Sequence, residues 1–136
     1  GLIDLNRPVA VLLVAVMHFV RDSEDPALII RRLMQHTAPG SYLVIAAAAS
    51  EGSDPVAVEG VERAYDGASA PLTIRPTQQI RAWLEPFHIV EPGLVDVRRW
   101  RPDRREPRFS EVAFGGVAYL TDWIEAVERP NPPVRR

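Results

Sequence analysis

An uninterrupted apolar stretch, Pro8 to Val20, constrains the fold of this 136-residue chain more than any other feature. It reads PVAVLLVAVMHFV, thirteen residues that are rich in valine and contain no Asp, Glu, Lys or Arg. A membrane-spanning helix would need about 18 or more apolar residues. A buried helix has a suitable length, but the β-branched side chains and the proline at the entry favour a strand. We predict a strand buried on both faces, which is typical of parallel sheets covered by helices.

The end of this predicted strand carries the first candidate site residues. In open α/β sheets, ligands bind outside the carboxyl ends of the strands. The residues at that end are Ala15, Val16, Met17, His18 and Phe19.

Composition excludes several classes of function. A net charge of −2 gives no electrostatic footprint for nucleic acid. The chain has no cysteine and only three scattered histidines, so we predict no metal site. All 16 basic residues are arginine, which excludes Schiff-base and P-loop lysine chemistry within the chain. No signal peptide or membrane anchor is visible, so we expect a cytoplasmic protein without a membrane partner.

Helix and strand signals alternate along the rest of the chain. Cap residues ahead of Pro26 predict a helix to about Thr37, and a Pro-Gly turn then leads into a strand from Ser41 to Ala49. This is a βαβ unit. The further predicted elements are a helix from Pro55 to Tyr65, a helix opened by Arg75 to Thr77 and ending near Pro86, a bent strand from Ile89 to Val97, a charged loop from Arg98 to Arg108, a strand from Glu111 to Leu120, and a short amphipathic piece from Asp122 to Val127 before a disordered tail.

Four blocks of this sequence, in order, resemble a known family. They are RPVAVLLVAVMHF followed by Asp22, then APGSYLVI, then the helix led by Arg75, then VEPGLVDVRRWRPD. Together they resemble the second half of an actinobacterial family of S-adenosylmethionine-dependent methyltransferases, long described as a domain of unknown function. The resemblance covers Leu5 to Asp103 and the strand ending near Val117.

The resemblance implies an α/β fold, a partial Rossmann-like class I methyltransferase sheet made of strands four to seven with flanking helices. The last strand would run antiparallel and form a closing hairpin with the sixth. On this basis residues 1–120 form the carboxyl-terminal half of a methyltransferase domain, and residues 121–136 form a short helix and a disordered tail. The fourth to seventh strands would be Pro8 to Val16, Ser41 to Ala47, Ile89 to Val97 and Glu111 to Leu120.

The resemblance also implies the cofactor S-adenosylmethionine and a small-molecule methyl acceptor. Ala15 to Phe19 would contact the cofactor, while Tyr65 and Trp100 would form walls of the acceptor pocket. Such families hold the cofactor with a glycine-rich turn and an acidic residue on their first two strands, yet the eight glycines of this chain include no G-x-G. The sequence therefore reads as a truncated half with an incomplete cofactor site, and it identifies no catalytic residue.

Each candidate side chain also has a purely structural interpretation. His18 and its neighbours fit a packed strand end, and Trp83 fits the apolar face of a helix. Trp100 fits a surface cluster of arginines neutralised by nearby acids; if functional, that cluster would suit an anionic substrate.

Two other functions remain open from sequence. A non-catalytic interaction module would use the apolar strand edge to form a homo-oligomer or to pair with a missing amino-terminal half. Half of another nucleotide-binding enzyme, such as a dehydrogenase, is disfavoured by the absence of G-x-G-x-x-G.

Overall fold

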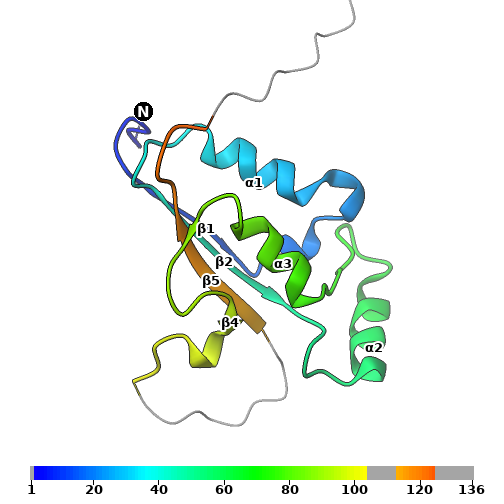
Figure 1. The fold of residues 1–136 in the computed structure, drawn as a ribbon. Helices are drawn as coiled ribbons and strands as arrows, with labels where there is room; N and C mark the ends of the chain where they lie inside the picture. Colours follow the sequence, from blue (N-terminus) through cyan, green and yellow to red (C-terminus); the bar gives the residue numbers. More distant parts are fainter. Residues whose placement is uncertain (1, 104–112, 125–136) are drawn as a thin grey trace, which may run out of the picture.

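The computed structural model describes residues 2–103 and 113–124, which form one mixed sheet with helices packed on one face (Figure 1). The strand order is β1-β2-β5-β3, and β4 pairs with β5 beside β3. The strands are β1 (Ala10–Val14), β2 (Tyr42–Ala48), β3 (His88–Ile89), β4 (Val95–Asp96) and β5 (Ala113–Tyr119). The helices are α1 (Pro26–Met34), α2 (Pro55–Tyr65) and α3 (Thr77–Leu84), with short 3-10 helices η1 (Met17–Phe19), η2 (Asp22–Glu24) and η3 (Val97–Arg99).

The sheet combines a parallel pair with an antiparallel last strand. β1 and β2 run parallel with Leu13 opposite Ile45. β5 runs antiparallel to β2, with Gly116 opposite Ile45, and antiparallel to β3 on its other side. The α/β class, the βαβ unit and the antiparallel final strand are therefore confirmed.

Aspartate caps start the first two helices where the sequence predicts them. The Asp25 carboxylate accepts a hydrogen bond from the Leu28 amide at 3.1 Å, and Asp54 accepts one from the Val56 amide at 3.0 Å. A proline follows each cap at the first helical position, where its missing amide proton costs nothing. α1 ends at Met34, three residues before the predicted end at Thr37.

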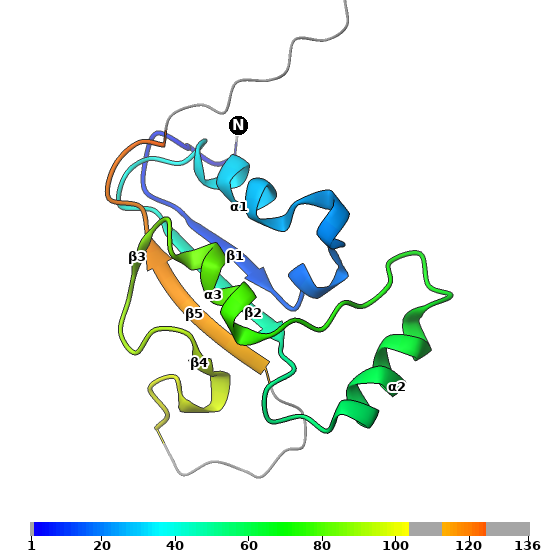
Figure 2. The same cartoon turned by 45° about the vertical axis from the view of Figure 1, so that its right-hand side comes forward.

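The hydrophobic core lies between the sheet and the pair α1 and α3. Leu43 and Ile45 of β2 are fully buried against Ile30 of α1 and Leu84 of α3. Gly116 of β5 allows α3 to pack closely on the sheet, because a Cβ at this position would lie only 2.8 Å from Leu84 Cδ1. Figures 1 and 2 both show α1 and α3 on this face, with α2 standing apart beyond the ends of β1 and β2.

β1 differs from the predicted strand in length and in burial. It covers five residues, and its exposure alternates: Leu12 is 64% and Val14 55% exposed, while Leu13 is half-buried. The prediction of burial on both faces is wrong for the described chain. Within residues 2–103 and 113–124 only β2 pairs with β1, and α1 and α3 cover one face alone. The strand stops because Ala15 has a left-handed backbone (φ 55°), which turns the chain into η1.

The carboxyl-terminal region is only partly described. The bent strand predicted from Ile89 to Val97 is divided into β3 and β4, with the predicted break at Pro92 and Gly93 between them. Asp122–Ile124 forms no helical turn. The rest of that predicted helix, the tail and residues 104–112 lie outside the described residues. No helix in the described part of the chain is long and apolar enough to cross a bilayer.

Candidate functional site

The chain turns at the carboxyl end of β1, beside the carboxyl end of β2, through residues 15–22, which we call the β1 turn. The Ala15 amide donates to the Ala46 carbonyl of β2 at 2.9 Å. The His18 carbonyl accepts from the Thr73 amide at 2.7 Å, in the segment leading to α3. The β1 turn is therefore held on one side by the neighbouring strand and on the other by a segment more than fifty residues away.

Three of the predicted site residues form an aromatic cluster on this turn. The rings of His18 and Phe19 meet edge to face with centroids 4.5 Å apart, and the Phe19 and Tyr65 centroids lie 6.0 Å apart. His18 and Phe19 are half-buried, and Tyr65, the last residue of α2, is 40% exposed. The fold thus brings the end of β1 and the end of α2 together into one partly open apolar wall.

The other predicted residues of the β1 turn divide between surface and core. Ala15 and Val16 are exposed, whereas the Met17 side chain is buried in the hydrophobic core. The Met17 side chain therefore anchors the turn in the core, and its backbone carbonyl serves as a hydrogen-bond acceptor.

Trp100 lies in a different part of the sheet. It follows η3, whose Val97 packs over Gly115 of β5, and the Arg101 guanidinium stacks 4.7 Å from the Trp100 ring. Figure 2 shows η3 on the β5 side of the sheet and the β1 turn on the opposite side. The described ring contacts of Trp100 do not include Phe19 or Tyr65. The two predicted acceptor walls, Tyr65 and Trp100, are not brought together by these contacts.

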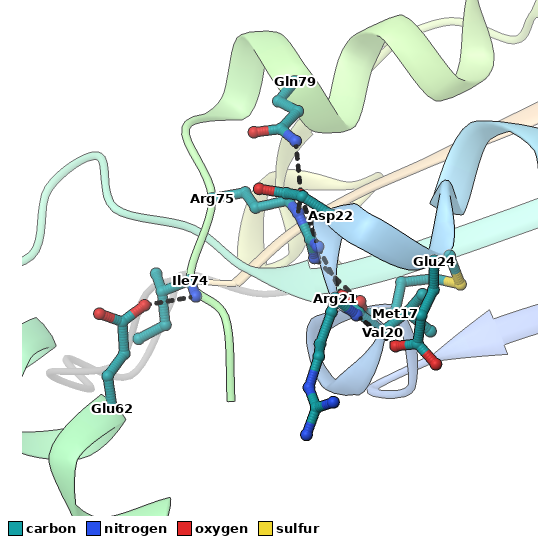
Figure 3. Close-up of polar contacts among 9 residues, drawn as sticks. All are labelled: Met17, Val20, Arg21, Asp22, Glu24, Glu62, Ile74, Arg75 and Gln79. Atoms are coloured by element: carbon teal, nitrogen blue, oxygen red, sulfur yellow. Dashed lines mark hydrogen bonds and ion pairs between the residues drawn. The ribbon is translucent and has the colours of Figure 1, made fainter. Parts of the chain in front are cut away.

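A buried arginine lies at the centre of this end of the sheet (Figure 3). The Arg75 residue is 2% exposed. Its Nε and Nη2 donate to Asp22 Oδ1 at 3.0 and 2.9 Å, Nη1 donates to the Met17 carbonyl at 3.0 Å, and Nη2 also donates to the Val20 carbonyl. The guanidinium carbon stands 5.3 Å from the Trp83 ring centroid. We call Arg75 and these three acceptors the arginine clamp.

The loop after β2 is attached at the same place. The Arg75 carbonyl accepts from the Ser50 amide at 3.1 Å. The Glu51 carboxylate accepts from the Thr77 amide at 2.8 Å and from the Thr77 hydroxyl at 2.9 Å, and so caps the start of α3. The ends of β1 and β2 and the start of α3 therefore form one connected unit.

Arg75 lowers the pKa of two neighbouring side chains. The hydrogen bond from Arg75 holds the pKa of Asp22 below its ordinary value, so Asp22 is ionised at neutral pH. Burial lowers the pKa of His18, and the charge of Arg75 lowers it further, so the imidazole is neutral. His18 Nδ1 is buried and has no hydrogen-bond partner within the described part of the chain.

Sequence reasoning missed the clamp. It placed Asp22 in a helix-cap cluster and Arg75 at the start of a helix, but Asp25 makes the cap and Asp22 binds Arg75 and Gln79. The two residues are 53 positions apart, and no local pattern signals their pairing. An arginine next to a proline at a helix start normally reads as a solvated side chain.

The residues at this end suit the apolar part of a nucleoside-containing ligand and not its hydroxyl groups. Phe19 and Tyr65 offer ring surface for stacking. Three carboxylates there are already hydrogen-bonded, Asp22 to Arg75, Glu51 to Thr77 and Glu62 to the Ile74 amide. No group of three or more metal-ligating side chains occurs among the residues that the structure describes.

Comparisons with known proteins give the family and the fold of the chain. Residues 1–121 match the family described as S-adenosyl methyltransferase. The crystal structure of a DUF574 family protein from Streptomyces avermitilis MA-4680 is similar, with a TM-score of 0.80 and 34% identity over 87% of this chain. A candidate methyltransferase from Thermobifida fusca YX shares the fold, with a TM-score of 0.76 and 23% identity over 88% of this chain. This chain spans 46% of the length of each of those proteins, and no curated protein matches it.

Proposed function

The chain belongs to the S-adenosyl methyltransferase family, and on that premise we propose that it forms the acceptor-facing half of an enzyme that methylates a small molecule. The observation that carries this proposal is the aromatic cluster of His18, Phe19 and Tyr65 at the carboxyl ends of β1 and β2. Ligands of open α/β sheets bind at that position.

In such a site, different described residues contact the cofactor and the methyl acceptor. When bound, S-adenosylmethionine supplies a methyl group on a positively charged sulfur. Val16, His18 and Phe19 of the β1 turn form an apolar wall beside the cofactor, and Tyr65 orients the acceptor across from Phe19. Methyl transfer gains most from alignment and exclusion of water, which rigid aromatic walls provide. The neutral imidazole of His18 keeps like charge away from the sulfonium.

Other groups must hold the polar part of the cofactor. The carboxylates nearby are already bonded within the chain, and its eight glycines include no G-x-G turn. We therefore propose that a complementing segment, equivalent to the part of the Streptomyces avermitilis relative that this chain leaves uncovered, binds the ribose and carboxylate. In the described sheet β1 pairs with β2 alone, so its other edge is the place for that segment to pair, and Leu12 and Val14 lie exposed on the uncovered face beside it.

Calorimetric titration with S-adenosylhomocysteine tests the proposal. We expect the chain alone to show millimolar binding or none. Mixed with the uncovered part of the Streptomyces avermitilis relative, it should bind with a dissociation constant near 1 μM, equivalent to about −8 kcal/mol. Phe19→Ala should weaken that binding at least tenfold, while Tyr65→Ala, its partner on the acceptor side, should leave it within about threefold.

Two results would contradict the proposal. Low-micromolar binding by the chain alone would show that its cofactor site is complete, which would refute the division of labour between two segments. An absence of binding by the mixture, at concentrations where the two parts associate, would remove the case for a methyltransferase site.

A second candidate is a non-catalytic interaction module that uses the same strand edge. It is favoured by two features: β1 pairs on one side only in the described sheet, and Leu12 and Val14 are exposed on the face next to that edge. Sedimentation of the purified chain separates the two candidates. A monomer at tens of micromolar argues against a self-associating module, whereas a stable dimer with no response to S-adenosylhomocysteine favours it.

A further inference from the structure

We propose that Arg75 is a positioning residue: through the arginine clamp it holds the β1 turn in the shape that presents His18 and Phe19 to the bound cofactor. The inference rests on the proposed function and extends it to a side chain that touches neither cofactor nor acceptor. Figure 3 shows the guanidinium reaching to the turn from the segment just before α3.

The first argument is that the polar partners of the Arg75 side chain all belong to the turn. A charge this deeply buried must be paired or hydrogen-bonded. Its described hydrogen-bond acceptors are the carbonyls of Met17 and Val20 and the carboxylate of Asp22. These three acceptors bracket His18 and Phe19 on both sides. The position of the guanidinium therefore dictates the path of the backbone that carries the two rings.

The second argument is that the turn has little internal support. Its own backbone bonds are those of one 3-10 turn, from the Phe19 amide to Val16 and from the Val20 amide to Met17, at 3.1 and 3.2 Å. Ala15 enters the turn in a left-handed conformation that alanine adopts only at a cost. A short segment of this kind needs external contacts to keep one shape. The bonds to Ala46 and Thr73 hold Ala15 and His18, and the clamp holds Met17, Val20 and Asp22.

The third argument is chemical. The planar guanidinium donates through three nitrogens to three separate acceptors. A lysine ammonium carries the same charge on a single nitrogen and cannot span that set of acceptors. If Arg75 served only to place positive charge in this region, a lysine substitution would preserve its function. If Arg75 fixes the shape of the turn, a lysine substitution will not preserve it.

The fourth argument is that the backbone of Arg75 is itself fixed to the end of β2. It pairs with Ala49 and accepts from the Ser50 amide directly after that strand. The guanidinium therefore extends to the β1 turn from an anchored position. Loss of the guanidinium should loosen the β1 turn, while these backbone contacts and the core between β2 and the helices remain.

Amide hydrogen exchange on the purified chain tests the positioning directly, with Arg75→Lys as the variant. The matched control is Arg81→Lys, an exposed arginine on α3, the helix that follows Arg75, where it pairs with Glu85. We expect the amides of Phe19, Val20 and Thr73 to exchange at least tenfold faster in Arg75→Lys. Amides of Leu43 and Ile45 in β2 should stay within twofold, and Arg81→Lys should change neither group.

The second arm measures S-adenosylhomocysteine affinity in the mixture with the complementing part. We expect Arg75→Lys to weaken binding at least tenfold and Arg81→Lys to leave it within twofold. Should Arg75→Lys fail to fold, Asp22→Ala serves instead, because this exposed side chain can be removed without opening the core. It should accelerate exchange at Val20 severalfold.

Three outcomes would overturn the inference. Equal acceleration in β2 and in the turn would make Arg75 a general stabilising residue. A looser turn with unchanged affinity would show that its shape does not matter for binding. If the unsubstituted mixture does not bind S-adenosylhomocysteine, the proposed function is wrong and the inference falls with it; if it binds and Arg75→Lys binds equally, only the inference is wrong.

Discussion

Two arginine–aspartate pairs on opposite sides of the sheet differ in what they connect. Arg75 and Asp22 are 53 positions apart, and the Arg75 side chain is 3% exposed. Arg98 and Asp96 are two positions apart in the turn that starts η3, and Asp96 also accepts from the Arg98 amide at 3.0 Å. The first pair joins two distant segments, whereas the second stabilises the turn in which both residues lie.

The difference shows that an arginine–aspartate pair can stabilise either the contact between two distant segments or the local turn that contains it. A local pair can form as soon as its turn forms, in a partly unfolded chain as well as in the native one. A long-range pair exists only when the tertiary structure is present, so its full free energy favours the native state. Substitutions in the two pairs should therefore give unequal effects.

The largest effect is expected for Arg75→Met, which removes the guanidinium and keeps a similar stem. Unfolding free energy should fall by about 3 kcal/mol, because the buried carbonyl of Met17 loses a donor and the turn loses its support. Urea unfolding followed by circular dichroism measures the change. A loss below about 1 kcal/mol would show that the clamp is no stronger than a surface contact.

A smaller effect is expected for Asp22→Asn. The Asp22 side chain is 66% exposed, so water screens its charge and the loss should be about 1 kcal/mol or less. The lowered pKa of Asp22 adds a pH dependence. Its contribution is present above the ordinary carboxyl pKa and is lost as pH falls through the native value. Asp22→Asn should therefore flatten the acid limb of the stability curve.

Arg98→Ala should cost no more than Asp22→Asn at neutral pH, about 1 kcal/mol or less, because the pair is local and Asp96 keeps its hydrogen bond from the backbone amide of residue 98. Its characteristic effect is on the unfolding free energy at acid pH. Hydrogen bonds from Arg98 lower the pKa of Asp96 to about 2 from 3.8, so the contribution of the pair is complete above pH 3.8 and disappears toward pH 2. Stability curves of the two proteins should converge over that interval. Curves that remain parallel there would contradict the assignment.

The finest test is the titration of His18 by NMR. Burial and then the charge of Arg75 lower its pKa, so Arg75→Met should raise it toward the ordinary 6.5, and Arg98→Ala should leave it unchanged. Because the native pKa lies below the unfolded one, the neutral ring stabilises the fold near pH 7 and this contribution is lost as pH falls. An identical His18 titration in wild type and Arg75→Met would show that the charge of Arg75 does not influence the pKa of His18.

Local signals in the sequence were sufficient for most of the elements. The caps at Asp25 and Asp54, each followed by proline, mark the starts of α1 and α2 because these interactions involve neighbouring residues. The bend at Pro92 and Gly93 is local in the same sense. The antiparallel direction of β5 came only from the family resemblance, since an apolar run reads the same in either direction.

Features that depend on distant residues could not be predicted in the same way. The extent and burial of β1 depend on what pairs with it and covers it, which its own apolar run does not encode. Phe19 and Tyr65 were each predicted as site residues, but their proximity follows from the placement of α2. The pairing of Arg75 with Asp22 joins two polar residues, each with an ordinary local explanation.

The position of β5 has a consequence for how the chain is made. β5 is the last strand of the described residues and yet lies inside the sheet, between β2 and β3. From the synthesis of Ala48 until that of Ala113, the inner edge of β2 has no partner strand. At roughly 5–20 residues per second this interval lasts on the order of 3 to 13 s. A nascent chain of this protein therefore spends seconds on the ribosome with an apolar strand edge open, which makes it a natural client for chaperones that bind extended hydrophobic segments.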